Sequence, residues 1–269
     1  MLMSCKNTSD NSPFTSLGMS VNFATGHKVH WTIDSTFTES PKNFVLQAAE
    51  TPDFSSLLWE KPVGDSFFGI DNTDYKQSWN DNTRYRVKLE TSKGVYYSPV
   101  LDFGKSQEER RKYGQSAEIQ RKELLRMQYT GEDVWLLKRR TVGQVDWDAV
   151  DEVDGTPTSY QNASLGTSWK QGFYNPLGFR LSVEDCQQQK QLTSPGVRED
   201  VIKAIRTIGF PIIGERDFVV FANDERYSVV NVKQVYFPGS DICVVQTGAL
   251  QLVTPSDPIY KMAMPERNI

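Results

Sequence analysis

The chain has few of the residues that most often build metal and redox sites. Its 269 residues include only three cysteines and two histidines. Cys5, Cys186 and Cys243 are odd in number, lie far apart and form no Cys-x-x-Cys pair, so neither a disulfide framework nor a zinc site is expected. His27 and His30 are three residues apart in a segment that reads as a strand. Their side chains should therefore point to opposite faces, at surface or strand-edge positions, and not share a metal ion.

Other familiar signals are also missing. No apolar run approaches the roughly 18 residues of a transmembrane helix. The N-terminal stretch MLMSCKNTSDNSPFTS has no apolar core of the signal-peptide kind, so we expect no membrane partner and a soluble chain made in a cytoplasm. The motifs GxSxG, GxxxxGKS/T and GxGxxG are absent. Because both histidines lie near the N-terminus, a histidine-based triad is excluded elsewhere, and we expect no enzyme, no cofactor and no bound metal.

Neither sign of charge dominates the chain as a whole. Thirty basic residues oppose 34 acidic ones, and a net charge of −4 is not the footprint of a duplex nucleic-acid binder. The length is enough for two domains, because single domains most often span about 100–150 residues. Changes in pattern indicate a flexible N-terminus, a β-rich region, a basic region with a long loop, and a second β-rich region. Their expected bounds are 1–13, 14–104, 105–180 and 181–269.

Residues 14–104 read as β-strands throughout. In HKVHWTIDSTF, Trp31 and Ile33 alternate with polar residues, and in TRYRVKLETSKGVYYSPVLDF, Tyr85 and Val87 do the same before an SKG turn. About seven short strands with regular turns are typical of two antiparallel sheets packed as a sandwich. The pattern resembles a fibronectin type III module, with Trp31 at the place of its core Trp and Tyr85 at that of the Tyr in YxVxxxT. The resemblance implies a binding or spacing module.

The stretch 105–140 is locally basic, with ten Lys and Arg against six Asp and Glu. Its apolar spacing predicts a helix over about 115–129 that ends at Thr130-Gly131, and VWLLKRR predicts a short strand with a basic tail. One interpretation is a solvated amphipathic linker helix. The other is a basic face that touches an acidic partner, or that lines a channel passing DNA without sequence specificity.

The loop 141–179 collects acids and aromatics, with five carboxylates, two Trp, two Tyr and two Phe. As a calcium loop with Gly155 at position 6, it would have Val150 at position 1 and Gln161 at position 12, so the EF-hand interpretation fails. A catalytic pair needs two carboxyl groups facing each other across a cleft, which clustering in one loop does not establish. We expect these carboxylates to be solvated. They are Asp146, Asp148, Asp151, Glu152 and Asp154.

The segments QRKELLRMQYTGEDVWLLKRRT and GTSWKQGFYNPLGF resemble structural proteins from the neck of tailed bacteriophages. In that group, a YTG…LLKRK strand leads into a loop with two Cys-x-x-Cys pairs, the second within CxxCxGTGFxGGYYxP. This chain keeps Gly166-Thr167, Gly172-Phe173-Tyr174 and Pro176, but lacks every one of the cysteines. The resemblance therefore implies a loop without the structural zinc that a Cys₄ set would bind. Aromatic packing, locally or on a neighbouring subunit, would hold the loop instead.

This resemblance implies a subunit or partner interface built from basic residues of the helix and strand and from aromatic residues of the loop. Its expected members are Arg121, Arg126, Trp135, Lys138, Arg139, Arg140, Trp147, Trp169, Phe173 and Tyr174.

The C-terminal region reads as a small barrel. Apolar residues from Val197 to Ile208 recur at helical spacing and predict a short helix that Gly209 ends. A hairpin over DFVVFANDERYSVVNVKQVYF, a turn at FPGSD and a strand pair over ICVVQTGALQLV should follow, as in a small β-barrel or curled sheet. Arg226-Tyr227 and the DPIY stretch at 257–260 resemble small β-barrels of phage head-completion and connector proteins. Tyr227 and Tyr260 are expected in core or interface packing, and Cys243 as a small buried residue.

The expected fold class is mainly β. It comprises an N-terminal Ig- or fibronectin III-like sandwich, a linker helix with a long loop, and a C-terminal β-barrel-like domain with one short helix. The expected function is a structural protein of the phage neck or head–tail connector, ring-forming, located in the virion and assembled in the host cytoplasm. Its partners would be copies of itself and neighbouring neck or tail proteins. Two alternatives are a carbohydrate- or cell-surface-binding virion module and, ranked last, a hydrolase that uses the loop carboxylates.

Purified protein is predicted to carry no stoichiometric zinc, because the loop lacks the cysteines found in the phage neck proteins that it resembles. Elemental analysis of protein prepared without chelators measures this directly. One zinc per chain would contradict this account of the loop.

Overall fold

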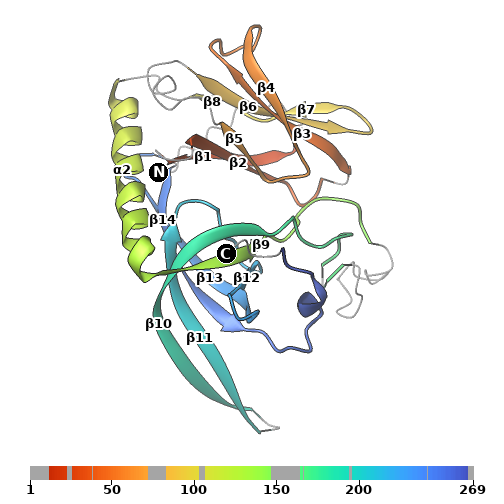
Figure 1. The fold of residues 1–269 in the computed structure, drawn as a ribbon. Coiled ribbons are helices and arrows are strands. Elements are labelled where there is room, and N and C mark those ends of the chain that lie inside the picture. The colour runs from red at the N-terminus through yellow and green to blue at the C-terminus, as the bar shows by residue number, and fades with distance from the viewer. Residues whose placement is uncertain are drawn as a thin grey trace. The chain divides into compact units, whose positions relative to one another are not determined.

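The fold of the computed structural model is drawn in Figure 1. The chain forms two compact units, and each has its own hydrophobic core. Unit 1 comprises Met1–Glu118, Thr141–Gln144 and Phe237–Ile242, and unit 2 comprises Ile119–Arg140, Val145–Tyr236 and Cys243–Ile269. The described residues are 12–22, 26–37, 39–71, 83–102, 107–146, 164–165, 167–193, 196–240 and 242–265.

Unit 1 consists mainly of two antiparallel sheets. The first has the order β1-β2-β5, and the second has the order β4-β3-β6-β7 with β8 also paired to β6. The strands are β1 (Phe14–Asn22), β2 (Gly26–Ile33), β3 (Pro41–Ala49), β4 (Leu57–Gly64), β5 (Phe68–Asp71), β6 (Arg84–Thr91), β7 (Val95–Tyr97) and β8 (Leu101–Asp102).

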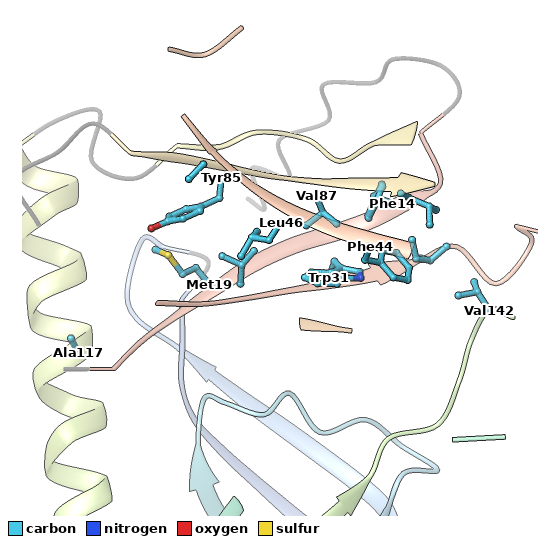
Figure 2. Close-up of a cluster of buried hydrophobic side chains, with 13 residues drawn as sticks. Phe14, Met19, Trp31, Phe44, Leu46, Tyr85, Val87, Ala117 and Val142 are labelled. Carbon is cyan, nitrogen blue, oxygen red and sulfur yellow. The ribbon is translucent and has the colours of Figure 1, made fainter. Parts of the chain in front are cut away.

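The period-2 pattern of the sequence builds the core of unit 1. On β6, Tyr85, Val87 and Leu89 are all fully buried, and the residues between them are partly exposed. Trp31 on β2 packs against Phe44 of the other sheet, with ring centroids 5.4 Å apart (Figure 2). The expected N-terminal sandwich of two antiparallel sheets is therefore confirmed.

One expectation for unit 1 is wrong, because His27 is buried instead of lying at the surface or a strand edge. Its side chain is 2% exposed and joins a polar chain that links the two sheets. The Tyr85 hydroxyl donates to Asp71 Oδ2 at 2.6 Å and lies 2.9 Å from His27 Nδ1. Since the hydroxyl proton is committed to Asp71, His27 Nδ1–H donates to the hydroxyl oxygen. The alternation of side chains along a strand predicts on which face His27 lies. It does not reveal that a polar partner on another strand lets His27 be buried.

Unit 2 contains a closed six-stranded barrel in the order β10-β11-β14-β13-β12-β9. Closure follows from β9, which pairs with β10 on one side and with β12 on the other. The strands are β9 (Gly131–Leu137), β10 (Leu177–Thr193), β11 (Gly196–Ile208), β12 (Phe218–Val220), β13 (Arg226–Tyr236) and β14 (Cys243–Leu252). The mainly β fold with a C-terminal barrel is thus confirmed.

Helix α2 (Gln107–Thr130) leads directly into β9, so the expected helix exists and ends at Thr130, but begins earlier than predicted. In unit 2 its inner face is fixed by polar contacts. Gln120 Nε2 donates to the Cys243 carbonyl at 3.1 Å, and Arg206 donates to both Glu123 carboxylate oxygens at 2.8 and 3.2 Å. Met127, fully buried, adds apolar contact.

The helix predicted within 197–208 is wrong, because these residues form β11. Their spacing fits a helix, yet the run is rich in Val and Ile, whose branched side chains favour strands. Pairing with both β10 and β14 then decides the conformation. The strand pair predicted over ICVVQTGALQLV is also wrong, since the segment forms the single strand β14. The short helical element of the barrel unit is instead the 3₁₀ turn η2 (Pro258–Lys261).

The β10–β11 hairpin continues past the strands that flank it in the barrel (Figure 1). β9 pairs with β10 only over Leu177–Ser182, and β14 pairs with β11 only over Ile202–Ile208. From Gln188–Val201 to Thr193–Gly196, the described residues of the two strands pair only with each other. We call this two-stranded extension, residues 188–193 and 196–201, the arm.

The buried polar chain predicts an acid-sensitive stability for unit 1. Burial lowers the pKa of His27 and outweighs the opposing charge of Asp71. Below about pH 6.5, His27 therefore binds a proton in the unfolded chain but stays neutral in the folded chain. The free energy of unfolding falls as the pH drops below that value, by up to about 1.4 kcal/mol per pH unit. Urea unfolding between pH 7.5 and 5 should show a steeper loss in the wild type than in His27→Gln. The matched variant His30→Gln should retain the steep loss, and equal slopes for wild type and His27→Gln would contradict the assignment.

Candidate functional site

The basic tail of β9 is built into the barrel of unit 2. Lys138 Nζ donates to Asp217 Oδ2 at 2.8 Å and to the Ile212 carbonyl at 3.1 Å. Arg140, 8% exposed, donates from Nε to the Phe173 carbonyl and stacks over the Tyr174 ring at 4.5 Å. Lys138 and Arg140 thus serve internal contacts, because the chain itself supplies their carboxylate, carbonyl and aromatic partners.

The aromatic residues of the loop also pack inside their own chain. Phe173 and Tyr174 are 3% and 7% exposed, and Phe173 meets Phe218 edge-on at 5.6 Å. Phe173 and Tyr174 thus pack locally, which is one of the two arrangements expected for the loop aromatics, and Arg140 is buried with them. Trp169 is partly buried and lies in an isolated bridge with Val145. Trp147 lies outside the described residues.

The remaining expected interface residues are more accessible. Arg121 and Arg126 are exposed on α2, and Arg126 pairs with Glu123 at 3.3 Å and Glu184 at 3.6 Å. Trp135 is partly buried against the small cluster that contains Leu137, Val220 and Ile259. Of the five loop carboxylates, only Asp146 lies within the described residues, so no catalytic pair from this loop is described. Asp146 is 3% exposed, so the expectation that it is solvated is wrong.

Asp217 is the main polar hub of the barrel. Its carboxylate, 2% exposed, accepts from Lys138 Nζ, from the Arg139 backbone N–H at 2.9 Å and from the Gly214 N–H at 2.7 Å. Burial raises the pKa of Asp217, opposed by the Lys138 charge and by the two N–H donors. These contacts tie the end of β9 to the turn before β12. One feature of the sequence points to this hub, because Asp217 lies between a Gly-containing turn and the FVV strand.

Beside this hub the surface of unit 2 is hollowed into a recess of about 270 Å³. Four apolar residues form much of its wall: Leu165, Phe173, Phe218 and Pro258. Its charged lining consists of Arg139, Arg216 and Asp257. The recess therefore combines an apolar wall with two guanidinium groups and one carboxylate.

The two stretches that resemble connector barrels are joined by direct contacts. Arg226, 3% exposed, donates to the Ile259 carbonyl and, at 3.0 Å, to the Met262 carbonyl. Its guanidinium lies 5.0 Å from the Tyr260 ring centroid, and the Tyr260 hydroxyl accepts from the Arg226 N–H. Asp257 caps η2 by accepting from the Ile259 N–H at 2.9 Å. The contacts fix the C-terminal segment on the barrel, and Tyr227 and Ile259 are buried as packing residues.

The described residues contain no group of three or more His, Cys, Asp or Glu side chains placed to hold a metal ion. Cys243 is a buried free thiol, and burial raises its pKa to about 11. Among the described residues, no helix combines the length and apolar character needed to span a membrane. No protein-family model matches the chain, and a comparison with curated proteins found no relative.

Removing the hub carboxylate should destabilise the barrel strongly. Asp217→Ala leaves Lys138 and two N–H donors without their acceptor, and breaking a buried pair typically costs about 3–5 kcal/mol. Urea unfolding followed by Trp fluorescence measures the loss. Asp133→Ala is the matched control, because the Asp133 side chain is 75% exposed in its 3.3 Å pair with Arg180, and should cost less than about 1 kcal/mol. Equally small losses in the free energy of unfolding for both variants would contradict the structural role of Asp217.

Proposed function

We propose that the chain is a ring-forming structural protein of a tailed-phage virion, in the neck or head–tail connector. The phage assignment rests on the resemblance of the stretch 110–179 to neck proteins. The observation that carries the assembly role is the arm. Under this proposal the chain is not an enzyme and uses no cofactor, and the sandwich of unit 1 serves as a binding or decoration module.

The arm favours assembly because a two-stranded ribbon has little support of its own. Six residue pairs, from Gln188–Val201 to Thr193–Gly196, extend past the barrel ladder, a reach of roughly 20 Å at strand geometry. Isolated two-stranded hairpins are marginally stable in water and normally need a third strand or a packed face. A neighbouring subunit would supply that surface. A head-to-tail contact of this kind closes into a ring when its rotation allows.

Helix α2 offers a second surface suited to assembly. Arg121, Leu125 and Tyr129 follow one another at intervals of four, so they share one face of the helix. All three are exposed, with Leu125 at 45% and Tyr129 at 89%. Tyr and Arg are enriched among residues that dominate binding energy at protein interfaces. The expected partners are copies of this chain and neighbouring neck or tail proteins, and DNA would pass through the ring without sequence-specific contacts.

Shortening the arm tests the assembly role. Replacing Gln188–Val201 by Asn-Gly closes a two-residue hairpin turn on the Gln187–Ile202 pair and leaves every strand pairing of β9 and β14 in place. The shortened chain should keep the circular dichroism and melting transition of the barrel but lose oligomers that the full chain forms alone or with a purified portal complex. Light scattering coupled to size exclusion and negative-stain microscopy measure the assembly.

Lys170→Ala, an exposed substitution outside the arm and α2, is the control and should assemble like the full chain. A full chain that stays monomeric at all concentrations and beside the portal complex would contradict the proposal. So would rings that form equally well without the arm.

A further inference from the structure

The recess in unit 2 is lined by two arginines and one carboxylate, so its lining carries an excess of positive charge. Neither the Arg139 nor the Arg216 guanidinium has a hydrogen bond or an ion pair within the described residues. The nearby carboxylate of Asp217 is occupied by Lys138 and two backbone N–H groups. The pKa of Arg139 is lowered, first by burial and then by the positive charge of Arg216, with Asp217 opposing. Two positive charges therefore face one recess, to whose lining Asp257 contributes a single negative charge.

Both arginines are held in place by the backbone around them. The Arg139 N–H donates to Asp217, and Arg139 forms an isolated bridge with Phe173. Arg216 adopts a left-handed φ of 69°, which is uncommon for a residue with a side chain, and its N–H donates to the Val229 carbonyl at 3.0 Å. Backbone strain of this kind is found preferentially at binding and catalytic sites. The hub thus positions the two cations next to the apolar wall.

We propose that this recess binds a carboxylate on a short apolar carrier, such as a glutamate side chain. Two guanidinium groups supply the planar donors that carboxylates accept. Leu165, Phe173 and Phe218 supply apolar surface for the methylene groups of the carrier. This inference does not depend on the proposed phage function.

The charge of the lining favours a carboxylate over a phosphate. Arg139 and Arg216 contribute two positive charges to the lining and Asp257 contributes one negative charge, which leaves +1 for a ligand to neutralise. A monoanion matches this balance, whereas a doubly charged phosphate would be repelled by Asp257. A volume of about 270 Å³ lies just below the roughly 300–1,000 Å³ of sites for drug-sized ligands, so a single side chain or a small free acid fits it.

The test uses the full-length chain and follows the arginine Nε–H resonances by ¹H–¹⁵N NMR. N-acetyl-glutamate N-methylamide should shift the Arg139 and Arg216 resonances and saturate in the millimolar range, since a single charge-paired contact supports about that affinity. The neutral glutamine analogue should cause no saturating shift. Inorganic phosphate should bind more weakly than the glutamate analogue. An acidic peptide that binds at least tenfold tighter than the free analogue would identify a protein side chain as the source, and equal affinities would identify a free acid.

Matched variants make the assignment specific. Arg216→Gln, at an exposed position, should weaken glutamate-analogue binding about tenfold or more, because a hydrogen bond to a charged group is lost. Arg139→Gln should do the same, and Arg111→Gln, an exposed change outside the recess, should bind like the wild type. The proposal is overturned if no arginine resonance saturates, if the glutamine analogue binds equally well, if phosphate binds more tightly, or if Arg216→Gln binds as wild type.

Discussion

Asp217 is a buried negative charge that the barrel of unit 2 must neutralise, and the way it does so organises the surrounding structure. A carboxylate that is 2% exposed is tolerated only with a cation and hydrogen-bond donors around it. Lys138 and Arg139, at the end of β9, provide an ammonium and a backbone N–H, and Gly214 provides the second N–H. The hub therefore joins the strand that closes the barrel to the turn that starts the next strand. A purely apolar core would not impose this geometry.

The same geometry explains where the recess comes from. Arg139 follows Lys138 directly, and Arg216 and Phe218 flank Asp217. These recess-lining residues are therefore next in sequence to Lys138 and Asp217, whose contacts form the hub. Arg226 plays a comparable part for the C-terminal segment by binding the carbonyls of Ile259 and Met262. The charged residues that resemble connector proteins are thus largely internal in unit 2. The proposed contacts rest on the arm, the exposed face of α2 and the recess.

The sequence predicted those parts of the fold that depend on local periodicity. The alternation around Tyr85, the helix stop at Thr130-Gly131 and the hairpin after Phe218 are fixed by neighbours in the chain and could be read directly. β11 could not, because its Val and Ile spacing fits a helix as well as a strand, and pairing with β10 and β14 decides between them. The recess could not be predicted either. Its arginines are 77 residues apart in the sequence, and the β9–β12 pairing together with the Asp217 contacts brings both to one surface.

Amide hydrogen exchange of the wild-type chain, resolved by residue, tests the central role of Asp217 most directly. The N–H groups of Arg139 and Gly214 lie outside the strand ladders and are bonded to the Asp217 carboxylate. If the hub holds the barrel together, these two amides should exchange as slowly as those of Leu136 and Val219 in the β9–β12 ladder, through the same opening of the barrel. Exchange of both amides at the rate of exposed loop positions, while the ladder stays protected, would contradict the account.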